Sequence, residues 1–217
     1  MSKPIIIIGS GGHAAVVADA LLAAGERVLG FTDTDPGRHG AVLCGLPVLG
    51  DDTVLDRHAR TALQLANGLG GIGSTRTETL RSKAQRGLEA QGWQFITVRH
   101  PSAVISPFAQ VRPGAQLMAR CVVQPGAVIG EGCIVNTGAV IEHDVQLAAY
   151  VHVACGAVLC GNVLVGAHSH VGAAAVVRQG LVLGEHTVVG AGAAVVKGSA
   201  GGATLVGVPA SKLRPSP

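Results

Sequence analysis

The most polar stretch of an otherwise apolar chain ends in a histidine flanked by two acidic residues. It reads VNTGAVIEHD from Val135 to Asp144, and its histidine is His143. A histidine can accept a proton near neutral pH, and a neighbouring carboxylate, Asp144 or Glu142, can hold its tautomer and raise its basicity. The segment therefore indicates a general base. The alternative is that His143 is an ordinary exposed residue, as many of the 9 histidines must be.

A second candidate site is the glycine-rich segment GSGGHA, residues 9–14. It matches G-x-G-x-x-A between an apolar run and a helical pattern, and the next apolar run ends in an acidic residue. Such glycines let backbone amides approach a diphosphate at the positive end of a helix. The alternative is that they only form a tight turn. The candidate ligand-binding residues are Gly11, Gly12, His13 and Asp33.

The first hundred residues alternate strand-like and helix-like segments, which predicts a Rossmann-like βαβ domain over residues 1–100. Pro101 marks its end. The expected strands are 4–9, 27–32, 62–69 and 93–98, and the expected helices are 14–24, 51–59 and 75–91.

Residues 101–217 carry a repeat of six. An aliphatic residue stands at every sixth position from Ile105 to Val195, sixteen times without a gap. This period fits neither an α-helix nor a hairpin, but it fits a chain wound into a triangular prism with three hexads in each coil of eighteen residues. We therefore predict an all-β parallel helix of about five coils, roughly 4.8 Å apart, followed by a short tail. Glycines such as Gly130 and Gly166 are expected to supply turn conformations.

The repeat places His143 at a corner of the prism and Gly161 one coil further on. A backbone amide near Gly161 would then lie about 5 Å from the backbone of the histidine. A base beside an amide donor suits acyl transfer, because one group takes a proton from an amine while the other stabilises the oxyanion.

Small residues also recur eighteen apart, at Cys155, Ala173 and Ala191, and are expected to leave a groove along another edge. The alternative is that these small residues pack against a neighbouring subunit. Outward-facing apolar residues on the prism predict a subunit interface in any case. They include Val122, Val128, Ile134, Val140 and Val158.

Composition narrows the class of protein. Of 217 residues, 48% are hydrophobic, 13% charged and 2% aromatic, and the formal net charge is +3. Few disordered chains have this composition, no apolar stretch approaches the ~20 residues of a membrane span, and the start lacks the zones of a secretory signal. Lys and Arg form no run, and the five cysteines show no CxxC pair. We therefore expect a cytoplasmic protein that binds neither nucleic acid nor membrane.

The repeat resembles the hexapeptide-repeat acyltransferases, whose parallel β-helix is left-handed. The closing GVPA, residues 207–210, followed by Lys212 and Arg214, is similar to the end of these enzymes. With the glycine segment and Asp33, the whole chain resembles the nucleotide-sugar N-acetyltransferases that modify 4-amino-4,6-dideoxyhexoses, the bacillosamine and perosamine enzymes. The resemblance implies acetyl-CoA as donor, a nucleotide-sugar acceptor, and a homotrimer with the coenzyme between subunits.

The segment IEHD, with Asn136 before it and YVHV after it, is similar to the catalytic segment of that family. The resemblance implies that His143 is the general base, Asp144 orients it and Asn136 lies near the acceptor sugar. It also implies that His152 contacts acetyl-CoA, and that the arm of the coenzyme lies in the groove of Ala173 and Ala191. One departure is Leu-Ala-Ala at residues 147–149, where the family usually has Ile-Gly-Asp.

Other functions remain open at this point. The related branch of the family that O-acetylates sugars such as sialic acid is the nearest alternative, and a noncatalytic nucleotide-binding scaffold is another. A dehydrogenase would lack room for its usual catalytic domain. His168 and His170 could suggest the metal site of a γ-class carbonic anhydrase, but Ala173 stands where the third histidine is expected, so no metal is predicted.

Overall fold

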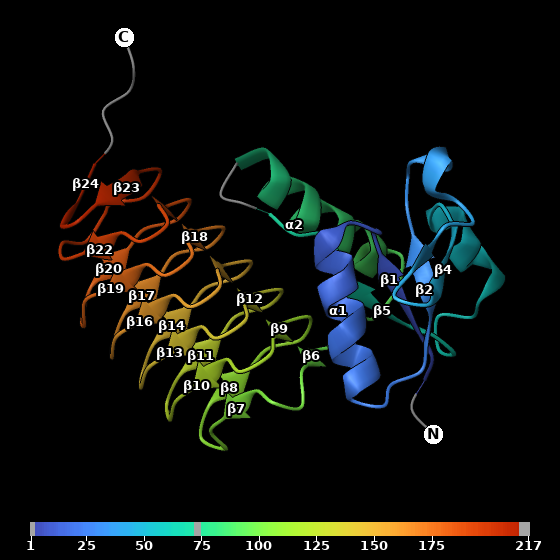
Figure 1. The fold of residues 1–217 in the computed structure, drawn as a ribbon, viewed down its shortest axis with the longest axis horizontal. Helices are drawn as coiled ribbons and strands as arrows, with labels where there is room; N and C mark the ends of the chain where they lie inside the picture. The colour runs from blue at the N-terminus through green and yellow to red at the C-terminus, as the bar shows by residue number, and fades with distance from the viewer. Residues whose placement is uncertain (1–2, 72–74, 213–217) are drawn as a thin grey trace, which may run out of the picture.

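The computed structural model describes residues 3–71 and 75–212. Figure 1 shows a small α/β unit, blue to dark green, beside a prism of stacked coils that runs from green to red. Arg214 lies outside the described residues. None of the described helices is long and apolar enough to cross a membrane.

The N-terminal unit contains β1 (Ile5–Ile8), α1 (Gly12–Ala23), β2 (Val28–Thr32), η1 (Pro36–Arg38), β3 (Val42–Leu43), β4 (Leu46–Gly50), η2 (Asp52–Arg57), β5 (Gln64–Asn67) and α2 (Thr75–Ala90). Its sheet has the order β3-β4-β2-β1-β5, and every pairing is parallel except the β3–β4 hairpin. The predicted βαβ arrangement is confirmed, whereas the hairpin was not predicted. The expected helix over 51–59 is the shorter 3-10 helix η2.

The strand β1 lies inside the sheet, between β2 and β5, and its four isoleucines are all buried. Ile5 and Ile7 pack with α1, while Ile6 and Ile8 pack with Trp93 on the opposite side. A continuous apolar run is what a strand covered on both faces requires.

The prism contains sixteen two-residue strands, β7 to β22, and each ends on one of the sixteen expected aliphatic residues. Face 1 consists of β7 (Val104–Ile105), β10 (Val122–Val123), β13 (Val140–Ile141), β16 (Val158–Leu159), β19 (Val176–Val177) and β22 (Ala194–Val195). Face 2 consists of β8 (Gln110–Val111), β11 (Val128–Ile129), β14 (Gln146–Leu147), β17 (Leu164–Val165) and β20 (Val182–Leu183). Face 3 consists of β6 (Val98–Arg99), β9 (Gln116–Leu117), β12 (Ile134–Val135), β15 (His152–Val153), β18 (His170–Val171), β21 (Val188–Val189), β23 (Thr204–Gly207) and β24 (Ala210–Lys212).

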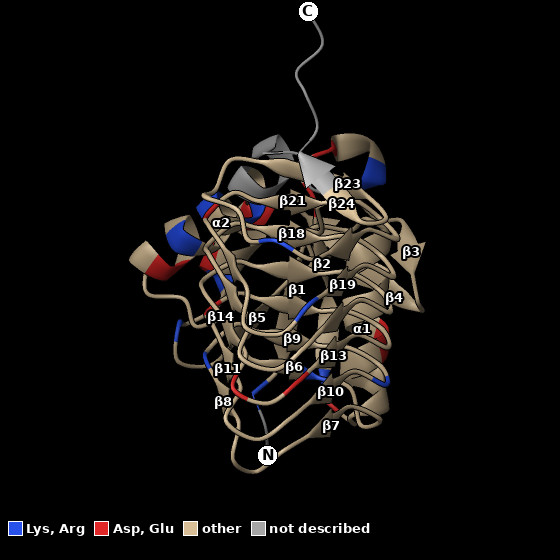
Figure 2. Ribbon diagram, turned by 90° about the vertical axis from the view of Figure 1, so that its left-hand side faces the viewer, with Lys and Arg blue, Asp and Glu red and all other residues tan. Residues whose placement is uncertain are grey.

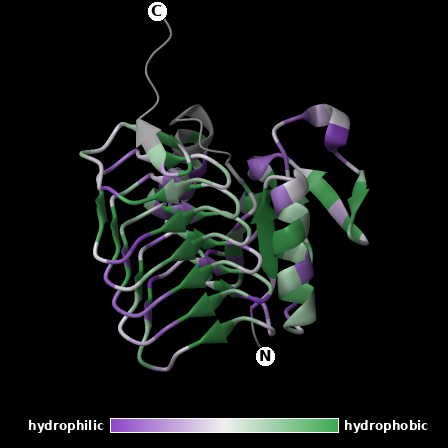
Figure 3. Ribbon diagram, turned by 60° about the vertical axis from the view of Figure 1, so that its left-hand side comes forward, coloured by the Kyte–Doolittle hydropathy of each residue, from purple (hydrophilic) through white to green (hydrophobic). Residues whose placement is uncertain are grey.

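Each of the strands β7 to β22 pairs in parallel with a strand eighteen positions away, as between Val122 and Val140. The second residue of each strand points into one continuous apolar core with the small residues four positions later. Figure 3 shows the strands in green and the polar residues mostly on the connections. The predicted fold, a Rossmann-like unit followed by a left-handed parallel β-helix, is confirmed.

Two kinds of position shape the corners. The third residue after an interior aliphatic has a positive φ in fourteen of the sixteen hexads, for example 59° at Asp144 and 58° at His168. Gly130 and Gly166 were expected to supply such turns, but they stand two residues earlier and have no positive φ. A Cβ at Gly130 would meet the Leu147 carbonyl oxygen at 2.6 Å. These glycines therefore allow one coil to approach the next.

The N-terminal unit packs on face 3. Ile134, predicted to lie at a subunit interface, is fully buried within the chain. Arg81 of α2 is also buried, and it donates hydrogen bonds to the carbonyl oxygens of Gly132 and Tyr150. Of the expected strand 93–98, Phe95 forms an isolated parallel bridge with Leu65 of β5, and strand β6 at its end already belongs to face 3. The division at Pro101 stays a prediction.

Candidate active site

The three corners of the prism carry different side chains. Corner 1–2, between faces 1 and 2, carries His143. Corner 2–3 carries a stack of rings in which His168 lies between Tyr150 and His186, with ring centroids 5.6 and 5.1 Å apart. Corner 3–1 carries the small residues that were expected to leave a groove.

At corner 1–2, His143 and Gly161 are in contact across adjacent coils. A Cβ built at Gly161 would overlap Nε2 of His143, so the ring lies directly over the glycine. The Asn162 amide also donates to the His143 carbonyl oxygen at 3.0 Å. Within the described part of the chain, the amide of Gly161 itself donates to no backbone acceptor. An imidazole therefore lies beside a glycine whose N–H remains available.

Asp144 fixes the orientation of this imidazole. Its Oδ2 lies 2.9 Å from Nδ1 of His143. Because a carboxylate only accepts, the proton must be on Nδ1, which leaves the lone pair on Nε2, the nitrogen that lies over Gly161. Both side chains are more than half exposed in the single chain. The predicted base, orienting acid and amide donor are thus brought together.

At corner 3–1 the predicted groove is present, with a volume of about 410 Å³. It runs along the prism axis across several coils. Its lining includes every residue predicted to contact acetyl-CoA and also the residue predicted near the sugar. These are His152, Ala173, Ala191 and Asn136, joined by Cys155 and His170.

His152 is held rigidly at the base of this groove. Its Nδ1 lies 2.7 Å from the carbonyl oxygen of Gly71, and its Nε2 lies 3.3 Å from Nδ2 of Asn136. The carbonyl requires a proton on Nδ1, so Nε2 accepts from the amide of Asn136. Burial lowers the pKa of His152 to about 3, and the nearby His170 and Arg81 add to the effect. His152 is therefore a neutral, oriented group.

The glycine segment borders a cavity of about 420 Å³ in the N-terminal unit. Gly11 and Asp33 both line it. Gly9 has a φ of +89°, and a Cβ there would meet Leu69 at 2.7 Å, so this glycine is required by the fold. A Cβ at Gly11 or Gly12 would meet nothing within 4 Å. The tight turn therefore explains Gly9 but not Gly11 or Gly12, and of these two only Gly11 lines the cavity.

Asp33 lies at the end of β2 and is bound from several sides. It accepts hydrogen bonds from the amide and hydroxyl of Ser10, and it lies 3.7 Å from the Arg38 guanidinium. Burial acts to raise the pKa of Asp33, but the hydrogen bonds from Ser10 and the Asp35 amide outweigh burial and lower it. The carboxylate is thus charged at the rim of the cavity. Arg38, not predicted as a site residue, lines the same cavity.

His13 lies elsewhere. Its Nε2 is 2.7 Å from Oε1 of Gln116 on face 3, and Gln116 in turn donates to the carbonyl oxygen of Asn67. Burial lowers the pKa of His13. His13 and Gly12 are not among the residues that line the cavity beside Asp33. His13 instead joins the N-terminal unit to the prism.

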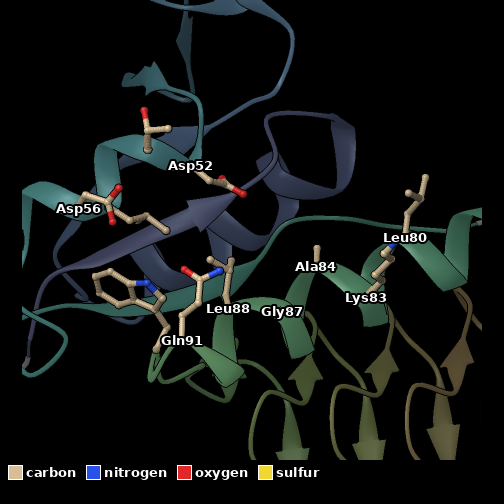
Figure 4. Close-up of a pocket in the computed structure, with 11 residues that line it drawn as sticks. Asp52, Asp56, Leu80, Lys83, Ala84, Gly87, Leu88 and Gln91 are labelled. Atoms are coloured by element: carbon tan, nitrogen blue, oxygen red, sulfur yellow. The ribbon is translucent and has the colours of Figure 1, made fainter.

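A neighbouring cavity of about 530 Å³ lies between η2 and α2 (Figure 4). Asp52 and Asp56 project from η2, and Lys83 projects from α2. Asp52 and Leu80 also line the cavity beside Asp33, so the two cavities adjoin along α2. In the described ranges 3–71 and 75–212, no three metal-ligating side chains gather at one point.

Comparison with known proteins gives a consistent result. Residues 4–79 match the family described as the PglD N-terminal domain. The acetyltransferase domain of PglB from Neisseria gonorrhoeae, solved with acetyl coenzyme A, is 33% identical with a TM-score of 0.90, covering 98% of this chain and 100% of that one. PerB from Caulobacter crescentus, solved with CoA and GDP-perosamine, is 36% identical with a TM-score of 0.88, covering 99% of each chain.

WeeI from Acinetobacter baumannii is 26% identical with a TM-score of 0.83, covering 98% of this chain and 100% of that one. None of the curated proteins matches the chain. The fold and the similarity to these solved structures define an acyltransferase of the hexapeptide-repeat class. Within that class the chain belongs to the nucleotide-sugar acetyltransferases that include PglB and PerB.

Proposed function

We propose that this enzyme transfers the acetyl group of acetyl-CoA to the 4-amino group of a nucleotide-linked 4-amino-4,6-dideoxyhexose. The observation that carries the proposal is corner 1–2, where Nε2 of His143 lies over Gly161 and Asp144 holds Nδ1. Acetyl-CoA as donor is supported by the PglB complex with acetyl coenzyme A. A nucleotide-sugar acceptor is supported by the PerB complex with GDP-perosamine.

In the proposed mechanism, Nε2 of His143 takes the proton from the sugar amine as the nitrogen attacks the thioester carbonyl carbon. The Gly161 amide donates to the oxygen that becomes negative. The carbon–sulfur bond then breaks, and the thiolate takes up a proton and leaves as free CoA. Asp144 stabilises the imidazolium while it exists. No acyl-enzyme forms.

The two substrates would bind to different parts of the chain. The groove at corner 3–1 is narrow and mostly apolar, which suits the arm of acetyl-CoA, with its acetyl end near His152. The cavity at the start of α1 suits the nucleotide, because Gly11 precedes a helix that has no side-chain cap and no acidic residue in its first turn. Unpaired amides at a helix start favour a diphosphate.

We infer that the working form is a homotrimer, because one chain cannot complete the site. His143 lies at corner 1–2 and the groove at corner 3–1, on opposite sides of face 1. If face 1 faces a threefold axis, corner 1–2 of one subunit meets corner 3–1 of the next. Face 1 is suited to this, since its outward residues are five valines and one alanine, and Figure 2 shows few charges on the prism strands.

A panel of nucleotide-sugars tested with acetyl-CoA, with release of free thiol as the readout, would test the function. We expect GDP-, UDP- or dTDP-linked 4-amino-4,6-dideoxyhexoses to release thiol and to give an alkali-stable amide. A hydroxyl-only sugar as the single active acceptor, giving an alkali-labile ester, would indicate the O-acetyltransferase alternative. Release by none of the panel would indicate a noncatalytic scaffold. The same panel with His143→Asn controls for contaminating activity.

We further propose a role in the synthesis of a surface polysaccharide or glycan, in the cytoplasm where nucleotide-sugars and acetyl-CoA are available. The resemblance to enzymes that modify bacillosamine and perosamine supports this setting.

A further inference from the structure

The groove at corner 3–1 contains a buried imidazole that forms no hydrogen bond among the residues the structure describes. His152 and Asn136 bond to each other, and His152 also bonds to Gly71. His170, one coil beyond His152, is 92% buried, since only 8% of it is exposed. Its Nδ1 is buried with no hydrogen-bond partner, and no hydrogen bond to its Nε2 is formed among the described residues. His170 therefore differs from its neighbours in having two uncommitted nitrogens.

Burial decides which nitrogen of His170 carries the proton. A neutral imidazole has one N–H and one lone pair. A buried N–H without an acceptor is among the rarest defects in folded proteins, and an unused acceptor is tolerated more readily. The buried Nδ1 is therefore the lone pair, and Nε2 carries the hydrogen. Since Nδ1 is the enclosed nitrogen and His170 lines the groove, Nε2–H faces the groove.

The surroundings keep His170 in this neutral form. The rings of His170 and His152 pack edge to face, with their centroids 4.8 Å apart and an angle of 80° between the ring planes. Burial lowers the pKa of His170, and the charge of Arg81 lowers it further. Protonation would place a second N–H on the enclosed Nδ1, which has no acceptor. The groove is thus provided with a fixed, neutral donor.

We propose that Nε2–H of His170 donates a hydrogen bond to the first amide carbonyl of the pantetheine arm of acetyl-CoA. This inference rests on the proposed function, which puts the acetyl end near His152 and the arm along Ala173 and Ala191. His170 lies one coil, about 4.8 Å, from His152 along the prism axis. A two-carbon spacer separates the thioester sulfur from the first amide of the arm. The length of this spacer is comparable to the distance of one coil between His152 and His170. His170 is a positioning residue that selects amide-bearing thioesters.

Two small donors test the bond directly. S-acetyl-N-acetylcysteamine carries the amide at the same spacing as acetyl-CoA, and S-butyl thioacetate lacks it. We expect the wild-type enzyme to favour the first donor in kcat/KM, and His170→Leu to lose about fivefold of that preference, as for one hydrogen bond. His170→Leu should raise the KM for acetyl-CoA by a similar factor and leave the KM for the nucleotide-sugar unchanged. His170→Gln, which keeps a donor, should restore most of the preference.

His186→Leu is the matched control, because it removes an exposed imidazole at corner 2–3. An unchanged donor preference in His170→Leu overturns the proposal. The variant Ala173→Trp distinguishes a wrong role for His170 from a wrong assignment of the groove. If only Ala173→Trp raises the KM for acetyl-CoA, the groove holds the arm and His170 has no part. If neither variant raises the KM for acetyl-CoA, both the groove assignment and the role of His170 are wrong.

Nitrogen-15 NMR of the wild-type enzyme provides a test without substitution. We expect Nε2 of His170 to be the protonated nitrogen and its shift to move when CoA is added. A proton on Nδ1, or no change on saturation with CoA, contradicts the proposal even if His170→Leu fails to fold.

Discussion

Nε2 of His143 lies over the Cα of Gly161, so that no side chain fits at position 161 while the imidazole keeps its place. The contact joins residues eighteen positions apart. It makes the glycine a determinant of where the base points. The consequences of this relationship can be measured.

Gly161→Ala should displace the imidazole without disturbing the prism. The three atoms nearest to the new methyl group would all belong to the exposed ring of His143, and Gly161 has no positive φ. We expect kcat to fall roughly 10- to 100-fold, because small misplacements of catalytic groups have effects of this size. The thermal midpoint should hardly change. Gly87→Ala, in α2 with open space around it, is the control. Equal kcat in both variants would contradict the assigned geometry.

His143→Asn should reduce kcat by about 100-fold or more, which is typical of a lost general base. The folded state should persist because the side chain is exposed and does not fill the core. Asp144→Asn should have a smaller effect, since the imidazole remains and loses only its orienting partner. Near wild-type turnover of His143→Asn at neutral pH would exclude His143 as the base.

The two substrate sites should respond to separate substitutions. Gly11→Val leaves the turn intact, because a Cβ there meets nothing within 4 Å, yet it fills the space beside the helix start. It should raise the KM for nucleotide-sugar by about tenfold, and Asp33→Ala should act similarly. Ala173→Trp should instead raise the KM for acetyl-CoA. If all three variants weaken acetyl-CoA alone, or if the chain binds NADH tightly and nucleotide-sugars not at all, the acceptor assignment is wrong.

The subunit interface can be tested by making the same substitution, valine to glutamate, once on face 1 and once on face 2. Val176 on face 1 is 43% exposed and Val182 on face 2 is 53% exposed in the single chain. Val176→Glu should yield monomers in sedimentation and abolish activity, because a charge would be buried at the threefold axis. Val182→Glu should remain a trimer. A wild-type chain that sediments as a stable monomer at micromolar concentration would contradict the intersubunit site.

Acid should destabilise the fold through His152. The folded pKa is about 3 and the ordinary value is 6.5, so between these pH values the unfolded chain binds one proton more. Stability is therefore lost as the pH falls below 6.5, by up to about 1.4 kcal/mol per pH unit. His152→Gln should show a shallower decline in denaturant titrations from pH 7 to 4.5. His186→Gln, an exposed control, should follow the wild type; equal slopes for both variants would refute the prediction.

The prism could be predicted because its signal is local. One aliphatic residue in six fixes what faces inward, and the eighteen-residue coil then determines that His143 meets Gly161. The groove followed from the same counting at Cys155, Ala173 and Ala191. These relationships depend only on the repeat, and no contact with another part of the chain enters them.

The junction between the two halves could not be predicted, because it depends on contacts between distant segments. Gly71 and His152 are eighty-one residues apart, and His13 and Gln116 are one hundred and three apart. Neither pair follows a repeat. Ile134 has the same place in its hexad as Val140, so the sequence pattern makes it equally exposed, yet the N-terminal unit covers it. The β3–β4 hairpin was missed since β3 has only two residues and only two of the five residues of β4 are buried.

The placement of His143 and the groove on opposite sides of face 1 has a genetic consequence. A subunit that lacks the base can still offer a good groove, and a subunit with a blocked groove can still offer its base. Two impaired variants, His143→Asn and Ala173→Trp, should therefore complement each other when they are expressed together, because some interfaces in the mixed trimers pair the intact half of each. Two defective alleles in one cell would then give more acetylation than either gives alone.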